Sequence, residues 1–445
     1  MPSEPAELSA ARVKRPPEPP EPAELSAARV DLPPEPAEPS TAQVDLPPEP
    51  AELSAAPVDL PPEPAGPSAA RVKQPPEPVE PATPSGLPSP SALPDPILPP
   101  AAVDALLAWY EKNARDLPWR HTSDPYRVWI SEIMLQQTRV EAVKPYYARF
   151  LSAFPTVADL AAAPEDQLLK LWEGLGYYSR ARNLQKAARV VVNDCSGSMP
   201  SSPERLLELP GIGDYTAGAI ASIAFGLPVP AVDGNVLRVL SRVSGSRSDV
   251  TRPETKSAFR SALLPVIPSD RAGAFTQSMI EIGATVCGPN AAPQCAVCPL
   301  APWCAAYRDG LTDLLPVRSA KKPRRVVDLT VLLIRDGRRT ALCRRPPRGL
   351  LAGLYEYPNL PGHLTPDELL PAIRSLGLDP IRLVRVEDAR HIFTHVEWHM
   401  IAYSVRVSPE IERADPRLLF VSDEDLRTNY ALPSAFSAYT KYGKN

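Results

Sequence analysis

The stretch SPERLLELPGIGDYTAGAIASIAF, residues 202–225, decides the fold of the central part of this chain. Ser202 followed by Pro203 is a typical helix start, because serine caps free backbone N–H groups and proline suits the first helical position. The glycines of the segment 209–213 predict a tight turn. After that turn one apolar stripe continues on a second helix, formed by Ala217, Ile220, Ala221 and Ala224. We therefore predict two helices joined by a glycine turn.

The turn itself, LPGIG at 209–213, has the composition of a phosphate-binding loop. Gly211 and Gly213 would let the backbone approach an anion closely, and the second helix would present its free N–H groups to that anion. Such a hairpin binds the DNA backbone without reading sequence. Glycine-rich turns between helices also arise for packing alone, so the residues leave both interpretations open.

Further along, VPAVDGNVLRVL at 229–240 places Asp233 at the start of a helix. Asp-Gly-Asn is also ordinary turn chemistry, and an aspartate there can serve only as a helix cap. The order of the features adds information, however. A helical hairpin followed by Gly/Pro-rich sequence and an aspartate resembles the superfamily of DNA glycosylases named for these three features.

Four cysteines follow in the order Cys287-x7-Cys295-x2-Cys298-x5-Cys304. Thiolates at such spacing can hold a [4Fe–4S] cluster or a tetrahedral zinc ion, and the spacing does not choose between them. The resemblance implies the [4Fe–4S] cluster, as in the endonuclease III and adenine glycosylase branches. Those relatives usually have six residues in the first gap, whereas this chain has seven. The loop GPNAAPQ at 288–294 also lacks basic residues for DNA contact.

Three more segments narrow the resemblance: 117–138 (LPWRHTSDPYRVWISEIMLQQT), 172–184 (WEGLGYYSRARNL) and 275–287 (FTQSMIEIGATVC). With the layout from about 105 to 435, they are similar to the adenine-specific mismatch glycosylases of the MutY type. The resemblance implies a base-excision repair enzyme that hydrolyses the N-glycosidic bond of adenine opposite 8-oxoguanine or guanine. It also implies double-stranded DNA carrying such mispairs as the partner. We expect the protein to act as a monomer.

Glu132 is the expected general acid of this family pattern. Helical periodicity alone favours a solvated helix face for it, but its neighbours Trp129, Ile130, Ile133 and Met134 could desolvate the carboxyl and raise its pKa. The resemblance implies that Glu132 protonates the flipped adenine at N7. Asp233 would stabilise positive charge on the deoxyribose, either as an anion or as a covalent nucleophile.

Position 215 separates two kinds of glycosylase. Bifunctional members of the superfamily carry a Schiff-base lysine there, whereas this chain has Tyr215, so the resemblance implies monofunctional base excision. It further implies that Arg120 and Gln277 surround the adenine, and that Gln137 and Tyr177 lie near the opposite base. Tyr177 would wedge into the base stack. Asp214 departs from the basic or neutral residue of many relatives, and we expect it to weaken backbone contact.

The C-terminal part changes to strand-like sequence. VVDLTVLLIRDGRRTALCRR at 326–345 predicts a hairpin with Asp336-Gly337 at its turn, and Thr365 with Glu368 predicts a capped helix. The segments RPPRGLLAGLYEYPN and HIFTHVEW resemble the Nudix-like domain of the same glycosylases, without the carboxylate cluster of a working Nudix hydrolase. The resemblance implies that Phe393, Thr394 and His395 contact 8-oxoguanine. A metal site of His391, His395 and His399 is disfavoured, because their spacing suits a helix and the segment 398–407 predicts a strand.

Composition completes the expected domain organisation. Residues 1–100 contain a repeat of about 14 residues, with 16 Asp/Glu against 6 Lys/Arg, while the remainder has 36 against 42. We predict a disordered, Pro-rich tail at 1–100, either a solvated extension or a ligand for an unknown proline-binding partner. An all-α bilobal core at 101–310, with its hairpin near 202–225 and iron–sulfur cysteines at 287–304, would be followed by a linker at 311–325. An α/β Nudix-like domain at 326–445 would complete a multidomain fold.

No segment predicts a membrane span or secretory signal, so we expect an intracellular enzyme, cytoplasmic and nucleoid-associated in a bacterium. Two alternatives remain open from the residues. One is a related glycosylase for another mismatched or oxidised base. The other is a DNA-binding scaffold without catalysis, whose tail recruits partners.

Overall fold

A computed structural model of the chain describes residues 93–289, 293–320, 323–409 and 412–443. All of them lie in one compact unit, Thr83–Asn445. The expected tail up to residue 92 and residues 290–292 of the loop between the first two cysteines lie outside the described residues. Within the described ranges, no helix is long and apolar enough to cross a membrane.

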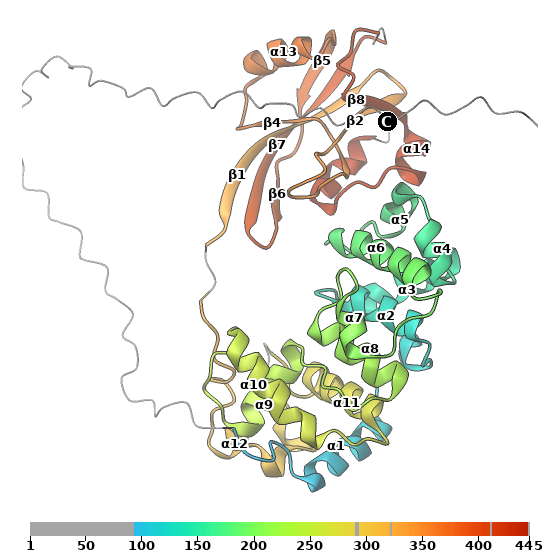
Figure 1. The fold of residues 1–445 in the computed structure, drawn as a ribbon. Helices are drawn as coiled ribbons and strands as arrows, with labels where there is room; N and C mark the ends of the chain where they lie inside the picture. Colours follow the sequence, from blue (N-terminus) through green and yellow to red (C-terminus); the bar gives the residue numbers. More distant parts are fainter. Residues whose placement is uncertain (1–92, 290–292, 321–322, 410–411, 444–445) are drawn as a thin grey trace, which may run out of the picture. The chain divides into compact units, whose positions relative to one another are not determined.

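The N-terminal two thirds of this unit are helical (Figure 1). The longer helices are α1 (Pro100–Asn113), α2 (Pro125–Leu135), α3 (Val140–Ala153), α6 (Ser179–Asp194), α8 (Asp214–Phe225), α9 (Gly234–Ser244), α10 (Pro253–Leu263) and α11 (Ala272–Thr285). The shorter elements are α4 (Val157–Ala162), α5 (Glu165–Leu171), α7 (Pro203–Leu207), α12 (Ala305–Arg308) and the turns η1 (Pro118–Arg120), η2 (Leu264–Val266), η3 (Cys295–Val297) and η4 (Ala301–Trp303).

Two hydrophobic cores divide these helices into two lobes, as the bilobal expectation required. One core gathers residues from α2 to α8, with Trp129, Trp172 and Phe150 fully buried. The other joins α1 to α9, α10 and α11, with Phe259 and Phe275 fully buried. From α1 in the second lobe, the chain passes through the first lobe from α2 to α8 and returns to the second lobe with α9. The contacts of α2 and α11 with α8 bring the lobes together.

The predicted helix starts are confirmed. Asp124 accepts a hydrogen bond from the Tyr126 backbone N–H and caps α2, with Pro125 in the first turn. Ser202 caps α7 in the same way through Arg205 N–H. The turn that follows α7 has Gly211 at φ 83°, and a Cβ there would come within 2.7 Å of the Asn183 Cβ. Glycine is therefore required at 211 both by backbone conformation and by the close approach to α6.

The boundary expected at residue 100 needs correction. Ile97 and Leu98 are 3% and 0% exposed, and both belong to the core formed by α1 and α9–α11. Their burial removes apolar surface from water ahead of α1, so the packed part of the chain starts before residue 97.

The C-terminal part forms one mixed sheet with the path β3-β2-β1-β7-β5. Its strands are β1 (Arg325–Arg335), β2 (Arg339–Arg344), β3 (Tyr355–Glu356), β4 (Asn359–Pro361), β5 (Pro380–Arg385), β6 (Ala389–Ile392), β7 (Val396–Val407) and β8 (Leu418–Ser422). β1 and β7 pair in parallel, β4 pairs with β1, β6 with β7 and β8 with β2. The predicted hairpin is confirmed: β1 and β2 are antiparallel, and Gly337 in their turn has a φ of 115°.

Both faces of this sheet are covered, as the alternation of side chains along β1 requires. Leu329, Val331 and Leu333 face a core that includes Phe436 and Tyr439 of η5 (Ser434–Gly443). Leu332 and Ile334 face the opposite core, which α13 (Pro366–Ser375) closes (Figure 1). The predicted capping box of Thr365 and Glu368 starts α13. A last short helix, α14 (Asp423–Thr428), follows β8.

Candidate active site

Glu132 lies on the buried face of α2, where its residue is 6% exposed. Burial raises the pKa of its carboxyl to about 7, and the negative charge of Asp233 adds to the rise. A hydrogen bond from Tyr215 and the nearby Arg120 act in the opposite direction. The apolar neighbours that suggested partial desolvation in the sequence therefore have that effect, and Glu132 is poised to exchange a proton near neutral pH.

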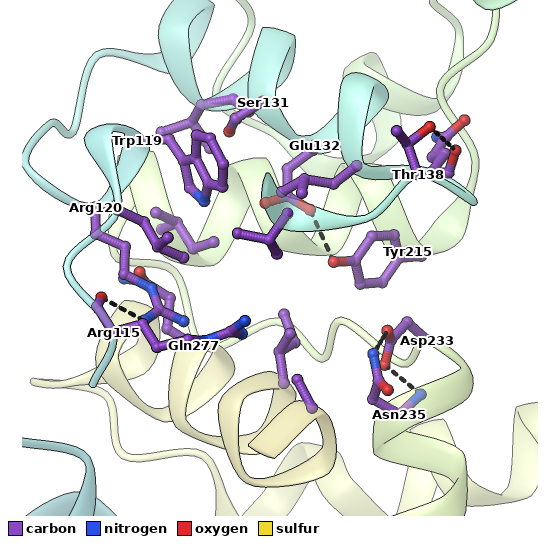
Figure 2. A pocket seen from close by; sticks show the side chains of 18 of the residues that line it. Arg115, Trp119, Arg120, Ser131, Glu132, Thr138, Tyr215, Asp233, Asn235 and Gln277 are labelled. Atoms are coloured by element: carbon purple, nitrogen blue, oxygen red, sulfur yellow. Dashed lines mark hydrogen bonds between the residues drawn. The ribbon is translucent and has the colours of Figure 1, made fainter. Parts of the chain in front are cut away.

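Tyr215 is placed by the first turn of α8, directly after the glycine turn. Its hydroxyl donates a 2.7 Å hydrogen bond to Glu132 Oε2. Figure 2 shows the two side chains pointing toward each other inside a pocket of about 430 Å³. Burial, followed by the charges of Glu132 and Asp233, raises the pKa of the phenol far above its ordinary value. Tyr215 therefore remains a neutral donor toward the carboxyl.

Asp233 lines the same pocket and is also the N-cap of α9. Its Oδ1 accepts hydrogen bonds from the backbone N–H groups of Asn235 and Val236, and its Oδ2 accepts one from the Asn235 side chain. Burial raises the pKa of Asp233, and these three donors oppose the rise. The helix-cap interpretation is confirmed, and the same aspartate lines the pocket, so the cap does not exclude a role in the site.

Two glycines that the sequence reading did not single out bring Asp233 into place. A Cβ at Gly218 of α8 would lie 2.3 Å from the Pro230 carbonyl oxygen, in the proline-rich segment before Asp233. A Cβ at Gly283 of α11 would lie 2.7 Å from the Asn235 Cβ. Only residues without a side chain allow these backbones to approach so closely. The available sequence signal was a glycine within each of two otherwise strong helix patterns.

Arg120 and Gln277 meet on another wall of the pocket, as Figure 2 shows. Arg120 is held from behind by Glu281, whose Oε2 accepts a 2.6 Å bond from it, while Arg115 makes two further side-chain bonds to the same carboxylate. Burial alone would raise the pKa of Glu281, but these arginine bonds outweigh it and hold the pKa at about 2. Glu281 and Arg115 were not identified from the sequence, although an acidic residue in the apolar run of α11 was visible.

Gln137 lines the same pocket, whereas Tyr177 lines a different cavity of about 600 Å³. That cavity also includes Phe393, Thr394 and His395. The Tyr177 and Thr394 hydroxyls are 3.3 Å apart, and the Phe393 ring packs edge-on against Trp398. The structure thus brings together Tyr177 and the β6–β7 turn, which are more than two hundred residues apart in sequence.

The four cysteines line one small cavity of about 20 Å³ between α9, α11 and the following turns. Burial raises the pKa of the Cys298 thiol to about 11, so a cation is needed to stabilise its thiolate at neutral pH. Arg242 donates a hydrogen bond to the Cys287 sulfur over 3.1 Å. Four thiols with a donor to one sulfur are the donor set of an iron–sulfur cluster, and the residues fit such a group. Among the described residues, no group of three or more His, Cys, Asp or Glu side chains is arranged to hold a metal ion, so the fit rests on the chemistry of the four thiols.

A chain of hydrogen bonds joins the cysteine cavity to the active site. Arg238 donates to the Cys287 carbonyl over 2.7 Å and to Asn235 Oδ1 over 3.0 Å, and Asn235 in turn donates to Asp233. Arg238 is 3% exposed and was missed by the sequence reading, since arginine in a helix is usually a surface residue. This buried arginine therefore makes the position of Asp233 depend on the fold of the cysteine segment.

The remaining predicted positions lie outside the pocket. Gly211 and Gly213 are both exposed in the turn before α8, where free N–H groups can meet an anion. Asp214, next to them, is exposed and forms a 2.6 Å ion pair with Arg260. Its charge is therefore partly compensated within the protein.

Comparison with known proteins identifies the family. Residues 130–265 match the family described as the HhH-GPD superfamily base excision DNA repair protein, and residues 330–442 match the NUDIX domain. An adenine DNA glycosylase of Mus musculus is 37% identical over 360 residues, which are 67% of this chain and 69% of the relative. The chain belongs to the adenine DNA glycosylases. An adenine DNA glycosylase of Homo sapiens is 32% identical over 75% of this chain and 73% of the relative. An adenine DNA glycosylase of Buchnera aphidicola subsp. Schizaphis graminum is also 32% identical, over 68% of this chain and 87% of the relative.

Among solved structures, a thermostable thymine-DNA glycosylase aligns at 31% identity and a TM-score of 0.43, covering 46% of this chain and 95% of that one. A trapped endonuclease III–DNA intermediate aligns at 26% identity and a TM-score of 0.41, covering 47% and 95%. As an adenine DNA glycosylase, the chain is a hydrolase of N-glycosyl bonds in base excision repair of DNA. The multidomain fold expected from the sequence is confirmed, with its helix-hairpin-helix core and Nudix-like C-terminal domain.

Proposed function

We propose that this glycosylase removes adenine opposite 8-oxoguanine, and also opposite guanine, without cleaving the DNA strand. The observation that carries this proposal is the pairing of Glu132 and Asp233 across one pocket, with Tyr215 bonded to Glu132. A carboxyl with a pKa of about 7 and a second carboxylate fixed by three donors are the acid and the anion that glycosidic cleavage needs.

Glu132 acts first as the acid. Its carboxyl proton passes to N7 of the extruded adenine, and the electrons of the breaking C1′–N9 bond move into the base, which leaves neutral. The deoxyribose then carries positive charge, which the Asp233 carboxylate stabilises at close range. Water adds at C1′ and loses a proton to Glu132, which restores the starting state.

Tyr215 supports monofunctional chemistry. A lyase needs an amine nucleophile that forms a Schiff base with the sugar, and a phenol held by Glu132 cannot form one. Water is therefore the acceptor of the glycosyl group, and the products are free adenine and an abasic site. The base itself is recognised by Arg120 and Gln277, whose polar groups converge on one wall of the pocket.

The opposite base is read outside this pocket. Gln137, which still lines the pocket, and Tyr177 lie near the opposite base, and Tyr177 wedges into the stack. The turn of Phe393, Thr394 and His395 contacts 8-oxoguanine, since the Thr394 hydroxyl can accept the N7–H that guanine lacks. The 3.3 Å approach of Tyr177 and Thr394 supports a shared role in that recognition.

Cys287, Cys295, Cys298 and Cys304 hold a [4Fe–4S] cluster in this proposal. Bound there, the cluster supplies four metal–thiolate bonds that cross-link the segment after α11. An absorbance band near the edge of the visible range and about four irons per chain are expected. A preparation with about one zinc per chain would contradict this assignment.

Single-turnover kinetics on a duplex with adenine opposite 8-oxoguanine tests the proposed reaction. Glu132→Gln and Asp233→Asn should each abolish excision while leaving DNA affinity unchanged, because both substitutions keep side-chain shape. Glu141→Gln is the matched control, since Glu141 is an exposed carboxyl of α3 that pairs with Lys144. Intact adenine after incubation with the iron-loaded wild type would refute the proposal. Normal rates in either active-site variant would reassign the acid or the stabilising anion.

Competition among duplexes tests the specificity. Adenine opposite 8-oxoguanine should be excised before adenine opposite guanine, and adenine opposite thymine should be spared. Faster release of another damaged base from the same mixture would instead identify a related glycosylase with a different substrate.

A further inference from the structure

Arg180 of α6 is a buried arginine that is 9% exposed and makes an unusual number of hydrogen bonds. Its Nη1 donates to the carbonyl oxygens of Ile133 and Met134 and, over 2.6 Å, of Gln136. Its Nη2 donates to the carbonyls of Leu175 and Gly176 and to the Thr138 hydroxyl. Arg180 therefore connects the end of α2 to the loop before α6.

No carboxylate balances this charge among the residues that the structure describes. The partners are carbonyl dipoles, a hydroxyl and two aromatic faces, since the guanidinium carbon lies 5.4 Å from the Trp172 ring and 5.5 Å from the Tyr177 ring. Burial lowers the pKa of Arg180 to about 10, so the cation persists at neutral pH. A buried cation without a counter-ion is costly, which suggests that it is retained for a function.

The two segments joined by Arg180 both contain a residue with left-handed backbone. Gln137 has a φ of 59° and Tyr177 a φ of 47°. Side chains other than glycine rarely adopt this conformation, and it persists only where the surroundings hold it. Arg180 bonds the carbonyl directly before each of them, that of Gln136 and that of Gly176. Ser196 and Leu351 are the other non-glycine residues of positive φ in the described ranges.

We propose that Arg180 is a positioning residue that holds Gln137 and Tyr177 in the conformation required to extrude adenine from the base pair. The inference rests on the proposed roles of these two residues at the opposite base. The planar guanidinium is essential because Nη1 bonds only the carbonyls at the end of α2, while Nη2 spans both segments and bonds Leu175, Gly176 and Thr138 at once. A lysine ammonium is a point charge and can satisfy only one segment at a time.

A purely structural role would be to cap the C-terminal end of α2, whose last carbonyls lack helical partners. If that role were the whole explanation, an Arg180 variant would be less stable, and its excision rate would fall by the same factor on every substrate. Positioning for extrusion predicts that the excision rate falls only where the adenine must first leave a base pair. The two roles therefore differ in substrate dependence.

The test compares Arg180→Lys with the wild type in single turnover on two duplexes. In one duplex adenine pairs with 8-oxoguanine, and in the other it faces an abasic site, where extrusion is easier. We expect excision of the paired adenine to be slower by about tenfold or more and excision of the unpaired adenine to change by less than about threefold. Arg189→Lys is the matched control on the same helix, because Arg189 is exposed and bonds only the Ala161 carbonyl.

A second measurement separates extrusion from chemistry. In the Asp233→Asn background, 2-aminopurine at the target position becomes fluorescent when it leaves the stack. Addition of Arg180→Lys should abolish that rise at saturating protein. If Arg180→Lys does not fold, Thr138→Val removes one Nη2 acceptor while keeping the arginine, and it should slow only the paired substrate.

Three outcomes overturn the proposal: equal slowing of both substrates, no slowing of either, or an unchanged fluorescence rise. Absence of adenine excision by the wild type would instead overturn the proposed function. The two failures are therefore distinguishable.

Discussion

The proposed role of Glu132 as an acid depends on its burial, because a carboxyl in water would be ionised at neutral pH and could not donate a proton. The α2 face around it is apolar, and Tyr215 and Asp233 are its polar partners in the pocket. These partners act in opposite directions on its pKa: the Tyr215 hydrogen bond favours the carboxylate, and the Asp233 charge favours the acid. The position of the proton at neutral pH is therefore a balance of burial, these two partners and the nearby Arg120.

Excision should depend on pH through Glu132. Above a pH of about 7 the acid loses its proton, so the single-turnover rate should fall by about tenfold per pH unit. Tyr215→Phe removes the bond that favours the carboxylate, and the alkaline limb should move to higher pH. Rate profiles between pH 5 and about 9 measure both effects. An unchanged alkaline limb in Tyr215→Phe would contradict the assignment.

The same pKa shift has a consequence for stability. The pKa of Glu132 rises from 4.5 in the unfolded chain to about 7 in the folded protein, so the folded state binds more protons between these values. The free energy of unfolding therefore decreases as pH rises through this window, by about 3 kcal/mol in total. Glu132→Gln removes the titration and should melt higher than the wild type at pH 8 but not at pH 4. Equal melting differences at both pH values would exclude this cause.

At the scale of elements, the contact between α9 and α11 sets the position of Asp233. Gly283 lets the two helices approach, and Arg238 fastens the start of α9 to the cysteine segment. The helix-hairpin-helix needs glycine at 211 for a different reason: its backbone has a positive φ, and a side chain there would collide with Asn183. Sequence patterns identified the hairpin, because turn glycines have a local signature. The role of Gly283 depends on a residue in another helix.

Gly283→Ala should therefore impair catalysis although alanine favours helices. The added methyl group would overlap Asn235 and shift the Asp233 carboxylate, which we expect to slow excision by about a hundredfold. DNA affinity and helix content should change little, since the hairpin is untouched. Circular dichroism, binding and single-turnover rates measure these effects together. A normal excision rate would show that α9 adjusts without moving Asp233.

For the whole molecule, every residue that lines the active-site pocket lies between 115 and 284. The C-terminal sheet contributes the turn of Phe393, Thr394 and His395, which lines the cavity of Tyr177. In the proposed function, excision takes place in the first cavity, and Tyr177 and the turn of Phe393, Thr394 and His395 read the opposite base from the second.

Removal of residues 1–92 should leave single-turnover excision unchanged, because the described residues that line the two cavities all lie between 115 and 435. Ile97 and Leu98 must be kept, since both are buried. A truncation that starts at residue 99 should therefore lower the melting temperature, whereas one that starts at 93 should not. Slower excision by the truncation that starts at residue 93 than by the full-length protein would show that the tail takes part in the reaction.

Local sequence determined the helix starts, the glycine turn, the β1–β2 hairpin and the spacing of the four cysteines, because caps, turns and ligand spacing involve residues that are close in the chain. The two carboxylates were singled out by the family resemblance, since local sequence alone favoured a solvated helix face for Glu132 and left Asp233 as a possible helix cap. Tertiary structure alone decided which residues surround those groups. Glu281 behind Arg120, Gly283 against Asn235 and Arg180 against Gln136 depend on contacts across 161, 48 and 44 residues. Such contacts leave no periodic pattern in the sequence. Glu132 is buried only when distant helices pack, and its raised pKa follows from that burial.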